Sequence, residues 1–575
     1  MKRLYITLLL LGISLSLSAQ VAKRVEVTKA FAPEIKEAKK MDITPNMVDT
    51  ITLRPEIDYS ITPRSFASSL GTHRFEPASV TYWEYRREYP FYLKLGLGYP
   101  LNSVSDFYAT THRADVGYLT GYMNHYGEYG KRRYADADGK TYKDQRAMCL
   151  TNKAGVMGGK YFGRYTLDGE AFYHMGIYDR FPLHSDYARR DVDYEDINLR
   201  LSFGDSFADY SHLNFKVYAS MDYYNDKSEN FIEGSKYQQM NVTAGGALAR
   251  EITKRSALSF NLNYSGYYGM KALSAYNNSI LEAQLMYHYR SGGLFDIKAG
   301  AKLAYDRNPA DAVKQDRVHA FPYLSFSLNI SDKGMFVPYV EIDGELQNNS
   351  YYSLVKRNPY VSILGEGFGA LQANTALPNT ELYNVRFGLS GHSANSKFAY
   401  RFYANMSFMN NALYWYNVNQ LFFGVESAKR NVWSLCAAVD YKPISQLLLT
   451  ASVKGSLYNN FSTVADALPP VEASLKLRYM HSKFTIGVSA DLYGTTKWTY
   501  IHDPHLFNPE TPSYVTSELR TVDAFVDLGL FFDWRVSKGC TLFVEGNNLA
   551  NMKTERWMFY REMGASFTIG AKIQF

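Results

Sequence analysis

The chain has 575 residues, of which 46% are hydrophobic, 15% aromatic and 21% charged. Its 49 tyrosines and 34 phenylalanines exclude a disordered chain, because disordered segments are poor in aromatic residues. Beyond the N-terminus the sequence lacks the apolar runs of about 20 residues that membrane-spanning helices need. The net charge of +6 comes without a basic block, so no nucleic-acid partner is indicated.

The N-terminus has the pattern of an export signal. Lys2 and Arg3 precede an apolar stretch from Leu4 to Leu17, and Ser18-Ala19-Gln20 follows as a small-residue cleavage site. We therefore expect a signal peptide over residues 1–19. The junction has no cysteine, so the mature protein is not expected to be a lipoprotein. The three cysteines, Cys149, Cys436 and Cys540, cannot form a disulfide framework.

Residues 20–90 read as a linker with local order. Prolines recur there at intervals of 8 to 12 residues, which prevents long helices: Pro33, Pro45, Pro55 and Pro63. We expect this segment to be a periplasmic extension or a partial plug of a barrel lumen.

Strict alternation of apolar and polar residues marks the rest of the chain. At the C-terminus, Phe567, Ile569, Ala571, Ile573 and Phe575 share one face of an extended strand, and polar or small residues share the other. The final phenylalanine, Phe575, is typical of a C-terminal signal read by the barrel-assembly machinery during biogenesis. Because the pattern repeats upstream, we expect 22 strands near the following residues: 91–99, 103–111, 114–127, 145–161, 164–178, 191–204, 209–222, 234–250, 256–269, 279–290, 294–306, 320–331, 335–347, 382–391, 397–411, 431–441, 446–457, 470–479, 482–492, 519–534, 538–546 and 565–575.

The connections between these strands alternate in length. Short ones lie at 290–293, 331–334, 391–397 and 480–483, and long loops are expected at 128–144, 348–381, 412–430, 493–518 and 547–564. Short turns on one side and long loops on the other are typical of outer-membrane barrels. We therefore predict an all-β, antiparallel up-and-down transmembrane barrel of about 22 strands over residues 91–575. A soluble repeat of ordinary strands is the alternative.

The polar face of each strand would line the lumen. Nine charged residues on that face are candidates for a solute path: Lys298, Lys302, Glu341, Asp343, Glu345, Lys454, Lys476, Arg478 and Asp491. Mutual salt bridges inside a closed barrel are an equally good interpretation. A lumen of this size needs a blocking element, which we expect to be residues 20–90, inward-folded loops (348–381 and 493–518) or a partner.

Two short motifs resemble the barrel domain of TonB-dependent receptors. The first is Leu542 to Leu549 with its Asn547-Asn548-Leu549 ending, together with the Trp557–Tyr560 loop and the last strand; the second is Pro378 to Val385. The cleavage site and the tyrosine-rich strands resemble outer-membrane proteins of Bacteroidetes. The resemblance implies a 22-stranded barrel that takes up a solute. The chain departs from that family because residues 20–90 are too few for its plug domain and lack its Gly-rich segment.

Engagement of TonB is left open. Val25 to Thr28 loosely resembles a TonB box, but an ordinary extended peptide is the alternative.

The sequence contains no catalytic motif and indicates no enzyme, no cofactor and no metal site. His502-Asp503-Pro504-His505 has metal-ligand residue types without a third ligand nearby, so a solvated loop is the better interpretation. Asp136 to Asp138 lacks the remaining ligands of a calcium loop. We therefore expect a receptor-like barrel in the outer membrane that passes or binds a solute. The alternative is a non-transporting subunit of a multi-protein assembly, with surface lipoproteins or other barrels as partners.

Overall fold

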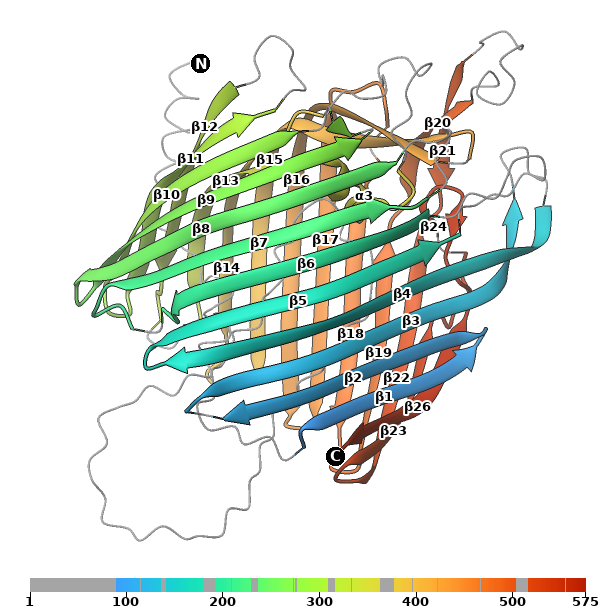
Figure 1. The fold of residues 1–575 in the computed structure, drawn as a ribbon, viewed down its shortest axis with the longest axis horizontal. Coiled ribbons are helices and arrows are strands. Elements are labelled where there is room, and N and C mark those ends of the chain that lie inside the picture. The colour runs from blue at the N-terminus through green and yellow to red at the C-terminus, as the bar shows by residue number, and fades with distance from the viewer. Residues whose placement is uncertain are drawn as a thin grey trace.

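The computed structural model describes residues 89–575, except for 114, 136–140, 180–191, 208, 229–235, 272, 275–276, 309–315, 332–333, 362–376, 396, 421, 466, 503–514 and 554. The described strands form a closed antiparallel barrel. Consecutive strands pair from β1 to β19, then β22, β23 and β26 follow, and β26 pairs with β1. The predicted 22-stranded transmembrane barrel is therefore confirmed. The near wall in Figure 1 runs from the blue β1 to the green strands, and the yellow-to-red strands form the far wall.

The barrel strands have these bounds: β1 Phe91–Tyr99, β2 Asn102–Arg113, β3 Gly117–Ala135, β4 Thr141–Phe162, β5 Tyr165–Tyr178, β6 Val192–Asp205, β7 Asn214–Asp226, β8 Tyr237–Thr253, β9 Ser256–Lys271, β10 Asn278–Arg290, β11 Phe295–Arg307, β12 Asp316–Leu328, β13 Val337–Gln347, β14 Thr380–His392, β15 Phe398–Val418, β16 Phe422–Ile444, β17 Leu447–Asn460, β18 Val471–Met480, β19 Phe484–Tyr493, β22 Phe525–Ser537, β23 Cys540–Asn547 and β26 Ser566–Gln574. The remaining elements are not part of the barrel wall. They are the helix α3 (Tyr351–Arg357), the hairpin of β20 (Thr496–His502) and β21 (Thr516–Val522), and the short pair β24 (Glu555–Trp557) and β25 (Tyr560–Arg561).

The two ends of the barrel differ. α3, β20–β21 and β24–β25 all belong to connections at one end, which we call the mouth. Tight turns such as Ser445-Gln446 close the other end, the short-turn end, which faces the periplasm in outer-membrane barrels. The first and last strands also meet at the short-turn end, where the amide of Phe91 donates to the carbonyl of Phe575 (3.0 Å) and the amide of Phe575 donates back (3.1 Å).

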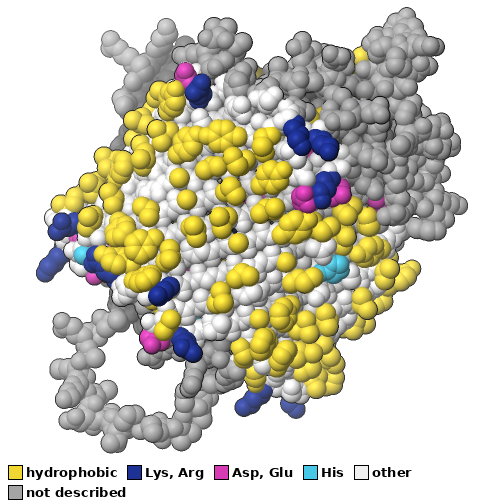
Figure 2. All heavy atoms as spheres, viewed as in Figure 1, with side chains coloured by type: hydrophobic (Ala, Val, Ile, Leu, Met, Phe, Trp, Pro, Cys, Tyr) yellow, Lys and Arg dark blue, Asp and Glu magenta, His cyan; other side chains and the backbone are white. Residues whose placement is uncertain are grey.

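The outer wall is apolar and the inner wall polar. Leu435 on β16 and Leu457 on β17 point outward, with exposed fractions of 70% and 74%, whereas their neighbours Ser434 and Ser456 are buried inside and hydrogen-bonded to each other (2.9 Å). Figure 2 shows apolar side chains spread over the outer face, with most Lys and Arg near its margins. This pattern is that of a wall surrounded by lipid. In the described part of the chain no helix is long and apolar enough to cross a membrane.

The largest departure from the predicted elements is at 412–430, which was expected to be a loop. The strands β15 and β16 instead continue through it as a hairpin of 21 and 23 residues. Residues 412–418 are all buried, because both faces of this hairpin are covered. A strand buried on both faces reads as a continuous apolar run rather than as an alternation, which is why the prediction was wrong.

Two smaller corrections concern strand ends. The predicted loop 128–144 is mostly strand, since β3 runs to Ala135 and β4 begins at Thr141. The predicted strand 519–534 is two elements, β21 and β22, that belong to different parts of the sheet.

At the seam, where β26 joins β1, two glycines make room for a ring. Gly570 pairs with Phe543 on β23 and with Gly96 on β1, and the Phe543 ring is fully buried over both glycines. The ammonium groups of Lys94 and Lys572 lie 4.6 and 5.3 Å from the centre of this ring. Because cations are attracted to an aromatic face, the ring both fills the space of the missing side chains and anchors the two lysines.

Candidate functional site

Charged side chains on the inner wall of β11 and β13 form ion pairs across neighbouring strands. Lys302 lies 3.7 Å from Glu282 on β10. On β13, Glu341 and Asp343 both contact the guanidinium of Arg386 on β14, at 3.1 and 3.2 Å. Two further predicted residues share these inner faces: Lys298, and Glu345, which accepts a hydrogen bond from Gln347 (2.6 Å).

The second group of predicted residues lies on β17, β18 and β19. Lys454 pairs with Glu472 at 3.2 Å, and the buried Asp491 accepts a hydrogen bond from Ser474 (2.6 Å). Arg478 lies 5.3 Å from the centre of the Phe531 ring, and Lys476 is exposed on the same face of β18. The predicted C-terminal residue Phe575 stacks on Phe91 with ring centres 5.1 Å apart.

Four of the nine predicted residues, Lys302, Glu341, Asp343 and Lys454, thus take part in ion pairs. For these four the structure favours the salt-bridge interpretation. A path for a solute along the other residues stays a prediction.

Removing Arg386 is expected to destabilise the barrel. The R386A variant leaves Glu341 and Asp343 without their shared cation, at an expected cost of roughly 1–3 kcal/mol, below the value for a fully buried pair because the three side chains keep 8–17% of their surface exposed. Urea unfolding in lipid vesicles measures the change. The R386K variant, which keeps the charge, should lose less than half as much stability, and equal losses would contradict the ion-pair argument.

The helix α3 crosses the interior of the barrel. It belongs to the connection between β13 and β14, yet its tyrosines contact the inner wall five or more strands away. The hydroxyl of Tyr352 donates to Asp196 on β6 (2.6 Å), that of Tyr351 donates to Asp226 on β7 (2.5 Å), and the amide of Tyr352 donates to Gln239 on β8 (3.1 Å). Asp196 is on the inner face, because its strand neighbour Ile197 is exposed on the outer wall.

The contact with Asp196 also affects the protonation state of the Tyr352 hydroxyl. Burial and the neighbouring carboxylate of Asp196 raise the pKa of Tyr352, so its hydroxyl keeps its proton and acts as the donor. Ser350 caps the helix by accepting a hydrogen bond from the amide of Ser353 (3.4 Å). Burial lowers the pKa of Arg357 to about 10.

After α3 the chain reaches the opposite side of the mouth. Val361 forms a β-bridge with Phe423 on the β15–β16 hairpin, and the ring of Tyr360 stacks on that of Tyr560 at 3.9 Å. Trp557 contacts Trp415, Phe423 and Trp498, with ring centres 5.2–5.6 Å apart. Elements from four connections or strand pairs therefore contact one another in the mouth: the α3 connection, the β15–β16 hairpin, β20 and the 557–560 turn.

We call this meeting point the mouth cluster. It is a single group of buried apolar and aromatic side chains from α3, the inner wall, the β15–β16 hairpin, β20–β21 and the 557–560 turn: Tyr224, Tyr237, Leu273, Tyr351, Tyr352, Leu354, Val355, Val361, Leu413, Trp415, Phe423, Val425, Trp498, Tyr500, Val522, Met558, Phe559 and Tyr560. The other face of the β15–β16 hairpin packs into a second cluster that includes Tyr414, Tyr416 and Val464. Such packing holds the hairpin across the mouth.

A buried polar hub fixes the root of the α3 connection. The Asn379 side chain donates to Asp306 (2.7 Å), exchanges two hydrogen bonds with Asn278 (2.7 and 3.1 Å) and accepts one from the amide of Asn349 (3.2 Å). Asn349 in turn donates to Thr380 (2.9 Å). Both ends of the connection, 349 and 379, are thus tied to each other and to β10 and β11. The sequence alone suggested no structural role for the motif Pro378–Val385. Its residues Asn379 and Thr380 belong to this hub and hold the root of the connection.

Several predicted features lie outside the described residues. These are the signal peptide, the segment 20–88 with Val25–Thr28, the acidic run Asp136–Asp138, and Asp503 to His505. Among the residues that the structure does describe, no group of three or more His, Cys, Asp or Glu side chains is arranged to hold a metal ion.

Comparison with known proteins identifies the fold. No family model matches the chain, and no curated protein does. Solved structures match over most of the chain. The FrpB iron transporter from Neisseria meningitidis is similar at a TM-score of 0.63 with 10% identity, covering 84% of this chain and 81% of that one.

Two further solved structures are similar to this chain over most of its length. The copper transporter OprC matches at a TM-score of 0.60 with 14% identity, covering 84% of this chain and 80% of that one. A Pseudomonas aeruginosa FpvA complex matches at 0.61 with 10% identity, covering 85% and 72%. The fold is that of TonB-dependent receptor barrels. At these identities the likeness extends to the fold alone.

Proposed function

We propose that the chain is an outer-membrane barrel that binds or passes a solute, as the similar receptors and transporters do. The observation that carries this proposal is the polar inner wall, shown by the Ser434–Ser456 hydrogen bond, which an apolar outer wall encloses. The segment 350–361 obstructs this interior, because it crosses from β13–β14 to the inner wall of β6–β8 and returns to β16. A polar lumen enclosed by an apolar wall needs such an obstruction, because an open barrel of this size would leave a wide aqueous channel. In this proposal the mouth cluster serves as a closure that the protein's own loops provide.

Planar-bilayer conductance tests the proposal. A variant in which residues 351–361 are replaced by a Gly/Ser linker of equal length is expected to conduct about tenfold or more above the wild type, because it removes the crossing segment from a wide lumen. Replacing Ser445 and Gln446, in a tight turn at the short-turn end, by glycines should leave conductance unchanged. Residues 20–88 are a second proposed obstruction, so the linker variant is also measured without them. If neither variant raises conductance, the transport proposal fails.

A non-transporting subunit of a multi-protein outer-membrane assembly is the second candidate. The extent of the mouth cluster favours it, because elements from four sectors of the wall pack into one buried group and would all have to separate for a solute to pass. Mild-detergent purification from the native membrane distinguishes the two. Stoichiometric surface lipoproteins or other barrels support the assembly, whereas a barrel that emerges alone supports transport.

A further inference from the structure

Three polar side chains form a hydrogen-bonded row across β2, β3 and β4. The hydroxyl oxygen of Ser103 lies 2.7 Å from Nε2 of His125, and Nδ1 of His125 lies 2.7 Å from Oδ1 of Asn152. The amide oxygen of Asn152 can only accept, so Nδ1 carries the hydrogen and Nε2 of the neutral ring is the acceptor. The Ser103 hydroxyl therefore donates to the ring nitrogen that can take its proton.

This row is on the outer wall of the barrel. Ser103, His125 and Asn152 each lie an even number of residues from an exposed apolar side chain of the same strand, and alternate residues share one face of a strand. All three are themselves partly exposed. The exposed apolar side chains are Phe107 on β2, Met123 on β3 and Val156 on β4.

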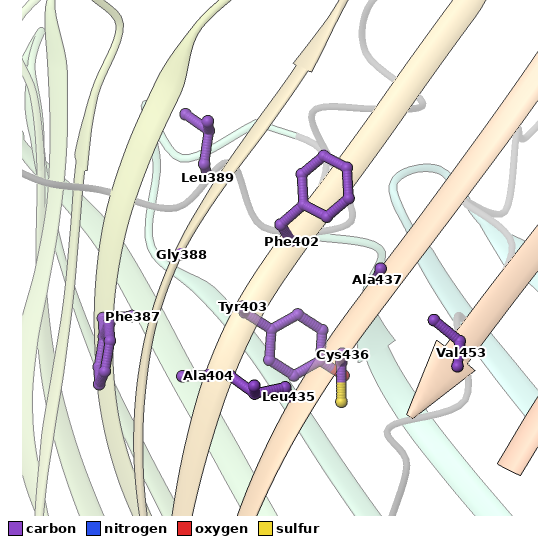
Figure 3. A pocket seen from close by; sticks show the side chains of 10 residues that line it. All are labelled: Phe387, Gly388, Leu389, Phe402, Tyr403, Ala404, Leu435, Cys436, Ala437 and Val453. Atoms are coloured by element: carbon purple, nitrogen blue, oxygen red, sulfur yellow. The ribbon is translucent and has the colours of Figure 1, made fainter. Parts of the chain in front are cut away.

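Much of the outer wall is apolar. Over β14 to β16, for comparison, Figure 3 shows Phe387, Phe402 and Leu435, which are 46%, 46% and 70% exposed. A hydroxyl, an imidazole and an amide are costly to place against hydrocarbon. Their presence in one connected row on this wall therefore points to a role at the membrane surface.

The row is at the mouth-side boundary of the membrane. Because β2 runs antiparallel to β1, it ends at Arg113 at the short-turn end, and Ser103 lies ten residues before that, or roughly 33 Å along the strand. With a strand tilt of about 40°, this corresponds to a height of roughly 25 Å, about that of the apolar band of such barrels. Ser103 is therefore at the level of the ester groups of lipids in the mouth-side leaflet.

A glycine leaves room beside the Ser103 hydroxyl, and a second hydroxyl lies next to it. Gly127 on β3 is the cross-strand partner of Ser103. A Cβ at Gly127 would lie 2.9 Å from the hydroxyl oxygen of Ser103 and 2.7 Å from that of Tyr129. The two hydroxyl oxygens are thus within about 6 Å of each other, so the Tyr129 hydroxyl can donate to an oxyanion that forms at Ser103.

We propose that Ser103 and His125, oriented by Asn152, form the active site of an esterase that removes acyl chains from membrane lipids. The Ser103 oxygen attacks the ester carbonyl while His125 takes its proton, and the Tyr129 hydroxyl stabilises the oxyanion. Collapse of this intermediate breaks the bond between the acyl carbon and the alcohol oxygen, which receives the proton from His125. Water then attacks the acyl-serine with His125 as the base, and a fatty acid is released.

The sequence could not reveal this arrangement. His125 lies 22 residues from Ser103 and 27 from Asn152, so no local motif contains them, and only the strand register brings them together. The prediction that the chain is no enzyme depended on such motifs. The proposed hydrolysis takes place outside the lumen and does not depend on whether the barrel transports a solute.

A fluorophosphonate probe and p-nitrophenyl palmitate test the active site in the purified full chain in detergent. The wild type is expected to form a phosphonyl adduct on Ser103, located by mass spectrometry, and to hydrolyse the ester. S103A should lose the adduct, and S103A and H125A should each hydrolyse the ester roughly 100-fold more slowly or worse. S105A is the matched control, because Ser105 faces His125 in the register but is the partner of neither ring nitrogen, and it should keep the wild-type rate.

Two further variants test the supporting groups, while the heat-modifiable band on a gel shows that each variant is folded. Y129F should lower kcat by roughly 100-fold, as expected for the loss of one oxyanion donor. N152D keeps an acceptor for Nδ1 and should remain active, with the acidic limb of its pH–rate profile moved to higher pH because a carboxylate stabilises the protonated imidazole. The proposal is overturned if the wild type neither reacts with the probe nor hydrolyses the ester, if S103A does both, or if S105A loses as much activity as S103A.

Discussion

Replacing Asn379 with alanine is expected to lower the free energy of unfolding by at least roughly 4 kcal/mol, since it leaves several buried groups unpaired and each of them costs roughly 1–3 kcal/mol. The side chain is 2% exposed and makes four hydrogen bonds, to Asp306, Asn278 and the amide of Asn349. Alanine removes all four and adds no new partner. Urea unfolding in lipid vesicles gives the size of the loss.

The same substitution should also release α3. Asn379 connects the two ends of the α3 connection, so N379A is expected to expose Tyr351 and Tyr352 to chymotrypsin, which cannot reach them while they are buried. Asn410 is the matched control, because it is only partly buried and makes a single hydrogen bond to Glu381 (3.0 Å). If N379A were no less stable than N410A and equally resistant to chymotrypsin, the hub would not hold the connection.

The G570A variant is expected to impair closure of the barrel at the seam. A Cβ at Gly570 would lie 1.9 Å from the carbonyl oxygen of Leu95 and 2.7 Å from the ring of Phe543. A backbone oxygen cannot move aside as a flexible side chain can, so β1 and β26 would have to separate or Phe543 would have to leave its place. We expect a loss of roughly 3 kcal/mol, at the upper end of what overpacking costs.

Heat modifiability on gels and urea unfolding measure this loss. Gly455 on β17 is the control, since a Cβ there would meet nothing within 4 Å. The G455A variant should be as stable as the wild type or slightly more so, because alanine lowers the entropy of the unfolded chain. Equal behaviour of the two variants would show that the space at the seam is not the reason for Gly570.

The strand count was predictable because a barrel wall separates lipid from a polar interior at every strand. That separation produces alternation of period two, as in Leu475 and Leu477 outward and Lys476 and Arg478 inward. Where the environment is the same on both faces, the signal disappears. Leu413, Tyr414 and Trp415 face two different clusters and are all buried, so their sequence is a continuous apolar run without the alternation that marks the other strands.

The candidate site was less predictable because it depends on register and on contacts across the lumen. Arg386 was not predicted, although Glu341 and Asp343 were, because only the pairing of β13 with β14 brings it between them. The seven residues of α3 show no sequence signal strong enough to separate them from a long loop. Their partner Asp196 lies more than 150 residues away. The role of Phe543 likewise follows from two glycines on two other strands.

The pairing of the first strand with the last has a consequence for the order in which the protein matures. Lys94 and its partner Glu545 are 451 residues apart, and the Phe91–Phe575 hydrogen bonds join the two extremes of the described chain. Contacts between residues so far apart in the sequence have the largest entropic cost of loop closure, and they form late in folding. Until synthesis and export have delivered the final strand, the sheet keeps two open edges, which hydrocarbon does not tolerate. We therefore expect insertion to wait for β26, and a chain truncated before this strand is expected to remain outside the bilayer.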